Sequence, residues 1–353
     1  MPDSDSAWVL GVDSGGSGLR VELAPADGPI GSGARAAAPH PAVTGDRGID
    51  ATSLLGLVAP LAEQLMREAG AARIDAACVG AAGMATLGDD LRARLPAAFA
   101  EAFGVRRLAL AGDAVTAYAG ALGLRSGVVV AAGTGMIALG VSAGGTGWRR
   151  ADGWGHLLGD AGGGAWIGRE GLDAAMRAFD GRAGGSPALL ALAEERFGPV
   201  TSLPAQLYPR PDRPAVLASF APDVARCAAE DPVASEILRR AATHILEAAA
   251  AVRPGPGPVE VALAGGLFGM GEPLLDPLRD QAEWLLPEAD LHAAAGDPLD
   301  GAVLVASALH RSALTLPADP ALLTLTETDA GTDGTETGTH TGTGDRPAPE
   351  TVR

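Results

Sequence analysis

The residues with the clearest chemical potential lie near the start of the chain, in the stretch VLGVDSGGSGLRVELA from Val9 to Ala24. Asp13 ends an apolar run that predicts a buried strand. Backbone amides of successive glycines can converge on an anion, and serine hydroxyls add further donors. A carboxylate beside them suits Mg²⁺, which proteins bind through one or two carboxylates and the phosphates of a substrate. We therefore expect Asp13 to hold the metal and the next four residues to bind phosphate: Ser14, Gly15, Gly16 and Ser17.

Two other chemistries use similar residues. The letters DSGG surround the nucleophilic serine of trypsin-like proteases, but that serine follows its histidine in the chain, and no histidine precedes Ser14. A dinucleotide site needs GxGxxG between a strand and a helix. The nearest match, GSGARA from Gly31, is followed by APHP, which breaks a helix. A tight hairpin with a capping aspartate is the remaining alternative for a single glycine turn.

A second glycine loop favours the phosphate site over that hairpin. The segment AAGTGM, from Ala131 to Met136, also joins two apolar runs, and it contains Gly133, Thr134 and Gly135. Each loop opens a three-strand meander that is followed by alternating helices and strands. Two α/β domains facing one another across a cleft are the natural interpretation of this repeat. Two facing glycine hairpins can clamp a triphosphate without a lysine.

Composition excludes several classes of protein. The 353 residues include 26 basic ones, all arginine, so a Walker P-loop, a protein kinase and Schiff-base chemistry are excluded. A net charge of -17 argues against a nucleic-acid partner. Two distant cysteines, Cys78 and Cys227, form no disulfide framework or metal set. No apolar run reaches the roughly 18 residues of a membrane span. The start MPDSDS is not a signal peptide, so we expect a soluble, cytoplasmic protein.

Periodicity predicts the elements that position these loops. Strands are expected at 8–15, 19–28, 29–38, 74–83, 106–114, 126–135, 136–145, 146–155, 259–269 and 289–295. Helices are expected at 51–70, 91–103 and 114–122, from 160 to 252 with a loop at 204–214, and at 299–310. After Leu325 the only bulky apolar side chain is Val352. The acidic, threonine- and glycine-rich end is therefore expected to be disordered.

With these motifs the chain resembles the actin, hexokinase and heat-shock-chaperone ATPases. Within that superfamily it is similar to the BadF/BadG/BcrA/BcrD ATPase family, which holds N-acetylglucosamine kinases and the reductase-activating ATPases of benzoyl-CoA metabolism. The resemblance runs from about Trp8 to about His310. Its motifs are GVDSGGSG and AAGTGM for phosphate, GDAVTAYAGA as the connection, VALAGGLF for adenosine and, most specifically, DGWGHLLGDAGGGAWIGREGL for the sugar.

The resemblance implies two ribonuclease-H-like (actin-like ATPase) domains with a nucleotide and sugar cleft between them. We expect the first domain at 1–115 and the second at 116–315, and the composition of the remaining residues, 316–353, predicts a disordered tail. The implied activity is transfer of the γ-phosphate of ATP, with Mg²⁺, to the 6-hydroxyl of N-acetylglucosamine. Free glucosamine is the alternative substrate, and a homodimer is left open.

The resemblance also assigns roles to residues. Asp113 would be the catalytic base, and Gly265 and Gly266 would lie against the adenosine. The implied sugar contacts are His40, Asp113, Gly153, Trp154, Asp160 and Gly164. Asp113 and Asp160 each precede an expected helix, so an N-cap is the simpler alternative for both. We expect Trp148 and Trp166 to be core residues and His156 to be a packing residue.

Two positions depart from the family pattern, and both bear on the choice of sugar. His40 stands where an asparagine bonds the sugar, and Met136 stands where a serine commonly follows the second phosphate loop.

Two functions of other classes compete with the kinase. A reductase activator needs clustered cysteines. A non-catalytic sugar sensor usually lacks the base or carries a DNA-binding extension.

Overall fold

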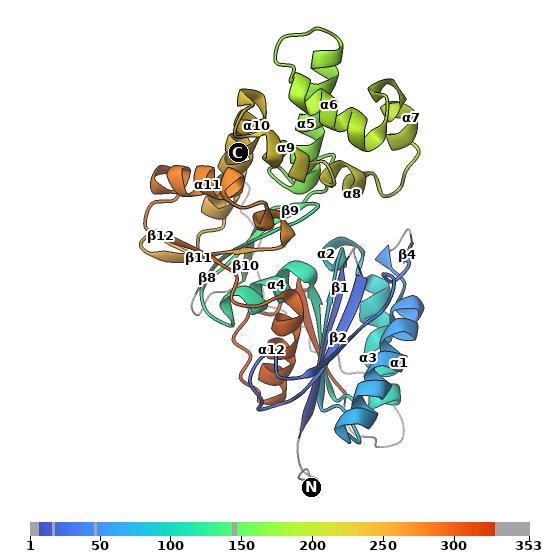
Figure 1. The fold of residues 1–353 in the computed structure, drawn as a ribbon. Helices are drawn as coiled ribbons and strands as arrows, with labels where there is room; N and C mark the ends of the chain where they lie inside the picture. The colour runs from blue at the N-terminus through green and yellow to red at the C-terminus, as the bar shows by residue number, and fades with distance from the viewer. Residues whose placement is uncertain (1–6, 16–17, 46–47, 143–146, 329–353) are drawn as a thin grey trace, which may run out of the picture.

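The computed structural model describes residues 7–15, 18–45, 48–142 and 147–328. Its strands form two large sheets, one above the other in Figure 1. The first sheet has six strands in the order β13-β7-β6-β1-β2-β3, and the second has five in the order β10-β9-β8-β11-β12. A small ribbon of β4 (Thr44–Gly45) and β5 (Gly48–Ile49) lies beside the first sheet. The expected mixed α/β architecture is confirmed.

Both sheets begin with the meander that the sequence predicts. In the first sheet β1, β2 and β3 are antiparallel neighbours, and β6 and β7 extend the sheet parallel to β1. Their bounds are β1 Trp8–Gly15, β2 Gly18–Pro25, β3 Ala34–Ala37, β6 Ala76–Ala81 and β7 Arg107–Gly112. In the second sheet the bounds are β8 Gly127–Ala132, β9 Met136–Val141, β10 Trp148–Asp152, β11 Val259–Ala264 and β12 Ala289–Ala293.

Helices α1 (Ala51–Ala69) and α3 (Asp89–Phe103) cover the outer face of the first sheet. Leu54, Val58 and Leu65 of α1 are buried at helical spacing, as the sequence predicts. The Asp50 carboxylate caps α1 by accepting the N–H of Ser53 at 2.7 Å. A short helix, α2 (Met84–Leu87), follows β6.

Helices α4 (Asp113–Leu122) and α12 (Pro298–His310) lie between the two sheets. One hydrophobic cluster contains side chains of both helices together with Val9 of the first sheet and Val129 of the second. The two helices approach closely because glycines face backbone: a Cβ at Gly301 of α12 would overlap the carbonyl oxygen of Thr116 in α4. The layer formed by α4 and α12 therefore connects the two halves of the molecule.

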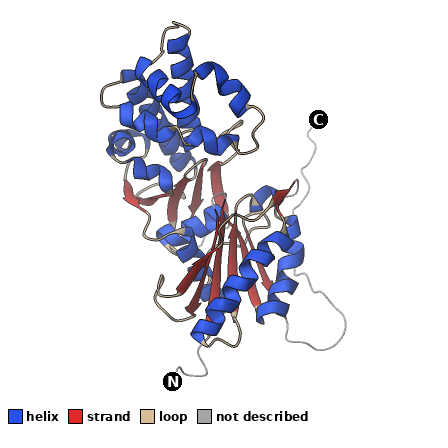
Figure 2. Ribbon diagram, turned by 45° about the vertical axis from the view of Figure 1, so that its right-hand side comes forward, coloured by secondary structure: helices blue, strands red, loops and turns tan. Residues whose placement is uncertain are grey.

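A group of helices covers the outer face of the second sheet, at the top of Figure 2. Its members are α5 (Gly164–Phe179), α6 (Pro187–Phe197), the 3-10 helix η1 (Val200–Ser202), α7 (Leu203–Leu207), α8 (Arg213–Ala218), α9 (Ala221–Cys227), α10 (Pro232–Ala251) and α11 (Glu272–Leu285). The expected loop at 204–214 is therefore wrong at both ends. Pro204 and Pro214 fall in the first turns of α7 and α8, where a helix tolerates proline because those N–H groups have no partner within it.

The end of the described chain corrects the expected tail. Residues 323–327 form β13 (Leu323–Glu327), which pairs antiparallel with β7, and Leu316, Leu322 and Leu323 are buried. The preceding helix α12 packs on β1 and β6 of the first sheet. The chain therefore returns to the first sheet before residue 328, and the part of the tail prediction that covers 316–328 is wrong. Residues 329–353 lie outside the described residues.

Candidate active site

Asp13 and Asp113 lie at the same edge of the first sheet. Strands β1, β6 and β7 are parallel, and their register places Asp13 opposite Gly80 and Ala81 opposite Gly112. Asp113 follows β7 directly, so the two aspartates stand two strands apart at the carboxyl ends of the strands. In open α/β sheets this is the edge at which ligands bind.

The Asp113 carboxylate is not a helix cap. It stands at the first residue of α4, where Gly112 is the N-cap, and its Oδ1 accepts the N–H of Ala114 at 2.9 Å rather than one further along the helix. Among the described residues no side chain pairs with it. Asp113 is exposed to solvent, but the surrounding protein displaces much of the water near its carboxylate. This loss of hydration raises the pKa of Asp113, and the negative charge of Asp13 raises that pKa further. These are properties of a carboxylate that can accept a proton.

Asp13 has an arginine partner that the sequence analysis missed. The Arg20 guanidinium donates to Asp13 Oδ2 from Nε at 3.1 Å and from Nη2 at 2.6 Å. Oδ1 of Asp13 has no partner among the described residues. A signal was present in the sequence, because a hairpin that pairs Gly15 with Gly18 must place Arg20 opposite Asp13. A free carboxylate oxygen in a partly exposed side chain fits the donor set of Mg²⁺.

The first glycine loop is only partly described. Gly15 stands opposite Gly18, and a Cβ at either position would meet nothing within 4 Å, so the backbone there is open to a ligand. Ser14 is fully buried on the opposite face of β1 from Asp13, and its hydroxyl has no partner among the described residues. The structure therefore does not bring the Ser14 hydroxyl to the site. Gly16 and Ser17 lie outside the described residues.

The second glycine loop joins β8 to β9 and presents Gly133 and Thr134 to solvent. The start of α5 fixes it from behind, because the N–H of Gly164 donates to the carbonyl of Gly133 at 2.9 Å and the N–H of Ala165 to that of Thr134 at 2.8 Å. A Cβ at Gly164 would lie 2.7 Å from the Gly133 oxygen. Gly164 is buried against the second glycine loop, so its packing role accounts for this glycine and no contact to a sugar is needed.

Asp160 closes the predicted sugar loop, residues 152–160, against the second glycine loop. Its Oδ1 accepts the N–H of Gly155 at 3.0 Å, and its Oδ2 lies so close to Gly135 of the second glycine loop that a Cβ there would overlap it. The N-cap of α5 is Gly163, so Asp160 does not cap that helix. A carboxylate offers about four lone-pair positions, so acceptor positions remain for hydroxyl groups. Burial is the main cause that raises the pKa of Asp160.

Two further groups hold the sugar loop in shape. The Asp152 carboxylate accepts the N–H of Asp160 at 2.6 Å and that of Ala161 at 3.0 Å. Arg150 donates to the carbonyl of Gly153 at 2.5 Å, and its guanidinium stacks 4.5 Å from the centre of the Trp154 ring. Trp154 is 64% exposed, so this ring offers an apolar face to a ligand. Asp152 and Arg150 were not predicted from the sequence.

The adenosine motif adjoins the second glycine loop. Strand β11 is parallel to β8, and Gly265 follows it with φ +101°. A Cβ there would overlap the carbonyl oxygen of Ala132, so only glycine fits. Gly266 is exposed at the start of the 3-10 helix η2 (Gly266–Met270), which leads into α11. Both glycines thus lie beside the end of β8.

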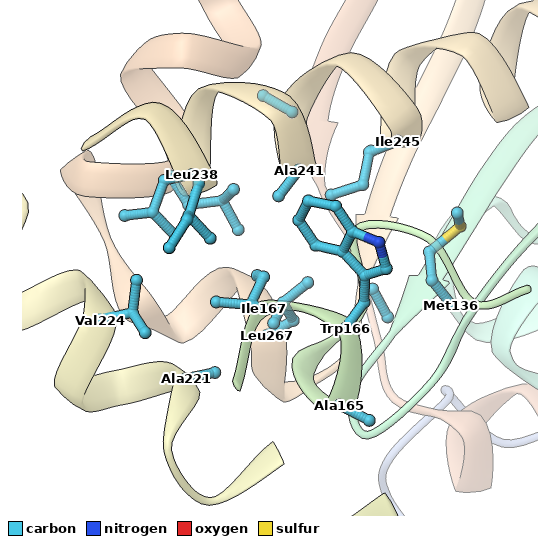
Figure 3. Close-up of a cluster of buried hydrophobic side chains, with 14 of the residues drawn as sticks. Met136, Ala165, Trp166, Ile167, Ala221, Val224, Leu238, Ala241, Ile245 and Leu267 are labelled. Carbon is cyan, nitrogen blue, oxygen red and sulfur yellow. The ribbon is translucent and has the colours of Figure 1, made fainter. Parts of the chain in front are cut away.

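The two departures from the family pattern have different positions. His40 is exposed three residues after β3, which runs in the same direction as β1, so it lies toward the same sheet edge as Asp13. Met136 is buried in the core cluster of Figure 3, close to Trp166 and Ile245. The Met136 side chain therefore does not face a ligand. Trp166 is confirmed as a core residue, and Trp148 is half-buried against Tyr118.

Several other features lie away from these residues. A cavity of about 680 Å³ is lined by α6, α9 and α10 and contains none of the predicted site residues. Cys78 is buried in β6, whereas Cys227 lies at the end of α9 on the other sheet. No group of three or more histidine, cysteine or acidic residues that could hold a metal occurs in the described part of the chain. None of the helices described is long and apolar enough to cross a bilayer.

Two α/β halves joined by a layer of two helices, with a glycine loop on each half, define the class of two-domain ATPases with an actin-like fold. The model of the BadF/BadG/BcrA/BcrD ATPase family matches residues 10–284, so the chain belongs to this family. The resemblance inferred from the motifs is confirmed.

Solved structures support the same fold. A protein from Chromobacterium violaceum assigned as an N-acetylglucosamine kinase is 30% identical, covers 85% of this chain and 98% of its own, and superposes with a TM-score of 0.65. A ROK family glucokinase from Streptomyces griseus, solved with glucose and AMPPNP, is 20% identical over 87% of this chain and 100% of its own, with a TM-score of 0.54.

A curated relative shows a shorter similarity. An N-acetylmuramic acid/N-acetylglucosamine kinase from Clostridium acetobutylicum is 40% identical over 76 residues. These residues are 22% of this chain and 24% of the relative, so the match spans about a quarter of that enzyme's length.

Proposed function

We propose that the protein is an ATP-dependent sugar kinase that transfers the γ-phosphate of ATP to the 6-hydroxyl of N-acetylglucosamine. One observation carries the proposal: Asp113, a carboxylate without a side-chain partner among the described residues, stands two strands from Asp13 at the ligand-binding edge of the first sheet. Family membership and the similarity to the Chromobacterium violaceum protein support it.

The nucleotide would lie between the two glycine loops. Backbone N–H groups at Gly15, Thr134 and Gly135 would bind the phosphates, since the N–H of Gly133 donates to the Gly135 carbonyl, and Gly265 and Gly266 leave room for the adenosine beside β8. Asp13 Oδ1 would hold Mg²⁺. When bound, the cation neutralises charge on the β- and γ-phosphates. In this proposal no arginine replaces the phosphate-binding lysine of a P-loop, because backbone groups of the two glycine loops hold the phosphates.

Asp113 performs the proton transfer. Its carboxylate accepts the proton of the sugar 6-hydroxyl as the hydroxyl oxygen attacks the γ-phosphorus and the bond to the β,γ-bridging oxygen breaks. Phosphoryl transfer depends mainly on positioning and charge stabilisation, so a single base at this place is sufficient. The raised pKa of Asp113 favours the proton-accepting step.

The sugar would be held by the second half of the molecule. Asp160 has acceptor positions left for sugar hydroxyls, and the exposed Trp154 ring can stack on the apolar face of a pyranose. His40 can donate to a hydroxyl from the first half. These contacts suit a neutral amino sugar, and glucosamine is the alternative substrate.

The test is a substrate panel in an ADP-release assay with mass analysis of the products. The panel contains N-acetylglucosamine, glucosamine, N-acetylmannosamine, glucose and N-acetylmuramic acid. We expect the highest kcat/KM with N-acetylglucosamine and a product that carries one phosphate. ADP release without a phosphorylated sugar would indicate an ATPase, and sugar binding without ADP release would indicate a sensor. Either result would overturn the proposal.

A further inference from the structure

A network of charged side chains joins Asp13 to the first turn of α12. It consists of two arginines and four acids: Arg20, Arg35, Asp13, Glu22, Asp297 and Asp300. Arg20 and Glu22 come from β2 and Arg35 from β3, whereas Asp297 is the N-cap of α12 and Asp300 lies in its first turn. Asp13 and Asp297 lie near opposite ends of the described sequence. The network is therefore a tertiary feature that no local sequence pattern predicts.

Arg20 is the member that contacts both ends. Nη1 donates to Asp297 Oδ2 at 2.8 Å, while Nε and Nη2 both donate to Asp13 Oδ2. The planar guanidinium carries its donors in a fixed fork, so it can fix two carboxylates in one relative geometry. Because both bonds to Asp13 go to one oxygen, Oδ1 is oriented but left unpaired among the described residues.

Asp297 also divides its two oxygens between two tasks. Oδ1 accepts the N–H of Asp300 and caps α12 in a capping box, whereas Oδ2 accepts from Arg20. The backbone of Asp297 lies against Gly120 of α4: a Cβ at Gly120 would overlap the carbonyl oxygen of Asp297. Asp13 is therefore linked through Arg20 to the place where α12 meets α4, the helix that begins with Asp113.

We propose that Arg20 is a positioning residue, which holds Asp13 with Oδ1 directed to the nucleotide-bound cation and couples that carboxylate to the first turn of α12. The inference rests on the proposed function. A carboxylate that is already ordered loses less freedom when a cation binds. Binding at Asp13 is thereby linked to the helix layer between the two halves, because Arg20 donates to Asp13 and to Asp297 at the same time.

The test separates the geometry of Arg20 from its charge. In Arg20→Lys the positive charge stays, but the ammonium is a point donor that cannot reproduce the fork between two carboxylates. Asp297→Asn keeps an oxygen that can cap α12 but breaks the charged link to Arg20. Arg311→Lys is the matched control. Arg311 lies just beyond the other end of α12 and bonds the carbonyl of Ala26 at 2.7 Å, far from Asp13 in the β1–β2 hairpin.

The first readout is the ratio of ADP dissociation constants without and with Mg²⁺, measured by calorimetry on the full chain. We expect Arg20→Lys to lower this ratio by about 3- to 10-fold, as loss of one pre-ordered side chain implies, and Arg311→Lys to leave it unchanged. The second readout is hydrogen exchange at the amides of Asp300 and Gly301. Mg²⁺ with ADP should protect them in the wild type and in Arg311→Lys, and should protect them less in Arg20→Lys and Asp297→Asn.

The outcomes distinguish the two claims. If the wild type binds ADP with Mg²⁺ but Arg20→Lys keeps the wild-type ratio and the wild-type protection of α12, the role of Arg20 is overturned while the kinase proposal stands. A wild type that binds no ADP overturns both. Equal losses in Arg20→Lys and Arg311→Lys would show a general effect of α12 stability and would also overturn the positioning role.

Discussion

Asp113 and Asp160 both stand near the start of a helix, where an aspartate is usually a cap. The structure assigns the caps to Gly112 and Gly163 instead, and leaves both carboxylates directed to other groups. Asp160 accepts the N–H of Gly155 in its own loop and lies against Gly135 of the second glycine loop, whereas among the described residues the Asp113 carboxylate accepts the N–H of its neighbour Ala114 and no side-chain donor. We therefore propose different tasks for them: Asp160 anchors the sugar, and Asp113 accepts its proton.

Asp160→Asn should weaken sugar binding more than nucleotide binding. Asparagine keeps one acceptor, but its amide NH₂ cannot accept a hydroxyl or N–H group, so a loop bond or a sugar bond is lost. We expect the KM for N-acetylglucosamine to rise by about 10-fold or more, as for loss of a bond to a charged group, with the KM for ATP changed much less. Asp173→Asn, on the exposed surface of α5, is the control and should alter neither. A larger change for ATP than for the sugar would contradict the assignment.

The pKa of Asp113 can be tested without any ligand. Displaced water and then the charge of Asp13 raise it, whereas a hydrogen bond from Arg210 lowers the pKa of the exposed Asp212. As the pH falls, Asp113 should therefore take up its proton first, above the usual aspartate value of about 3.9, and Asp212 only below that value. Carbon NMR of the carboxyl groups, assigned with Asp113→Asn and Asp212→Asn, measures both. The reverse order would show that the environment of Asp113 is not as described.

At the scale of elements, the contact between α4 and α12 depends on glycine. Gly301→Ala would place a methyl group onto the Thr116 carbonyl oxygen. That oxygen belongs to the backbone of α4, so the clash can be relieved only if one of the two helices shifts. We expect a loss of about 1–3 kcal/mol in the free energy of unfolding, typical of overpacking. Gly56→Ala in α1 is the matched control, because nothing lies within 4 Å of its Cβ. Alanine should stabilise that helix by about 0.5–1 kcal/mol. Urea unfolding of both variants tests the contrast.

Strand β13 yields a second prediction at this scale. Leu323 is fully buried beside β7 and Leu325 is 42% exposed, although both are leucines of the same strand. Leu323→Ala should cost about 2–5 kcal/mol of stability, as for other buried leucines, and Leu325→Ala much less. Thermal unfolding followed by circular dichroism compares them. Equal, small effects would mean that β13 does not form part of the sheet.

The elements were predictable where a local pattern carries them. Both meanders, α1, α4 and the strand before Gly265 follow from apolar periodicity and glycine turns. Strand β13 was missed because composition was weighed over the whole end of the chain, although LTLT alternates with period two. The helical residues within 204–214 were not predicted because proline usually breaks a helix, whereas in a first turn it is tolerated.

Of the candidate site, the residues that follow buried strands could be predicted from the sequence, but most contacts between side chains could not. Asp13 and Asp113 follow from their places after buried strands, and the register of the β1–β2 hairpin would have given Arg20. The bonds from Asp152 to Asp160, the stacking of Arg150 on Trp154 and the link from Arg20 to Asp297 join residues whose contacts depend on the folded chain. The burial of Ser14 follows from the alternation of β1, which turns its side chain away from Asp13.

At the scale of the whole molecule, the proposed reaction draws on both halves. The base and the metal-holding carboxylate belong to the first sheet, and the sugar loop, the second glycine loop and the adenosine glycines belong to the second. Among the described elements, α4 and α12 form the layer between them. A sugar held by the second half must therefore present its 6-hydroxyl to Asp113 on the first, and this transfer is the central claim.

The most direct test compares phosphate transfer from ATP to N-acetylglucosamine by the wild type and Asp113→Asn, with ADP affinity measured on both. The wild type should form one sugar phosphate for each ADP. The variant keeps the shape of the side chain but cannot accept a proton, so its turnover should fall by about 100- to 10,000-fold, while its ADP affinity stays within about threefold. A variant that kept more than about a tenth of the wild-type turnover would show that Asp113 is not the base.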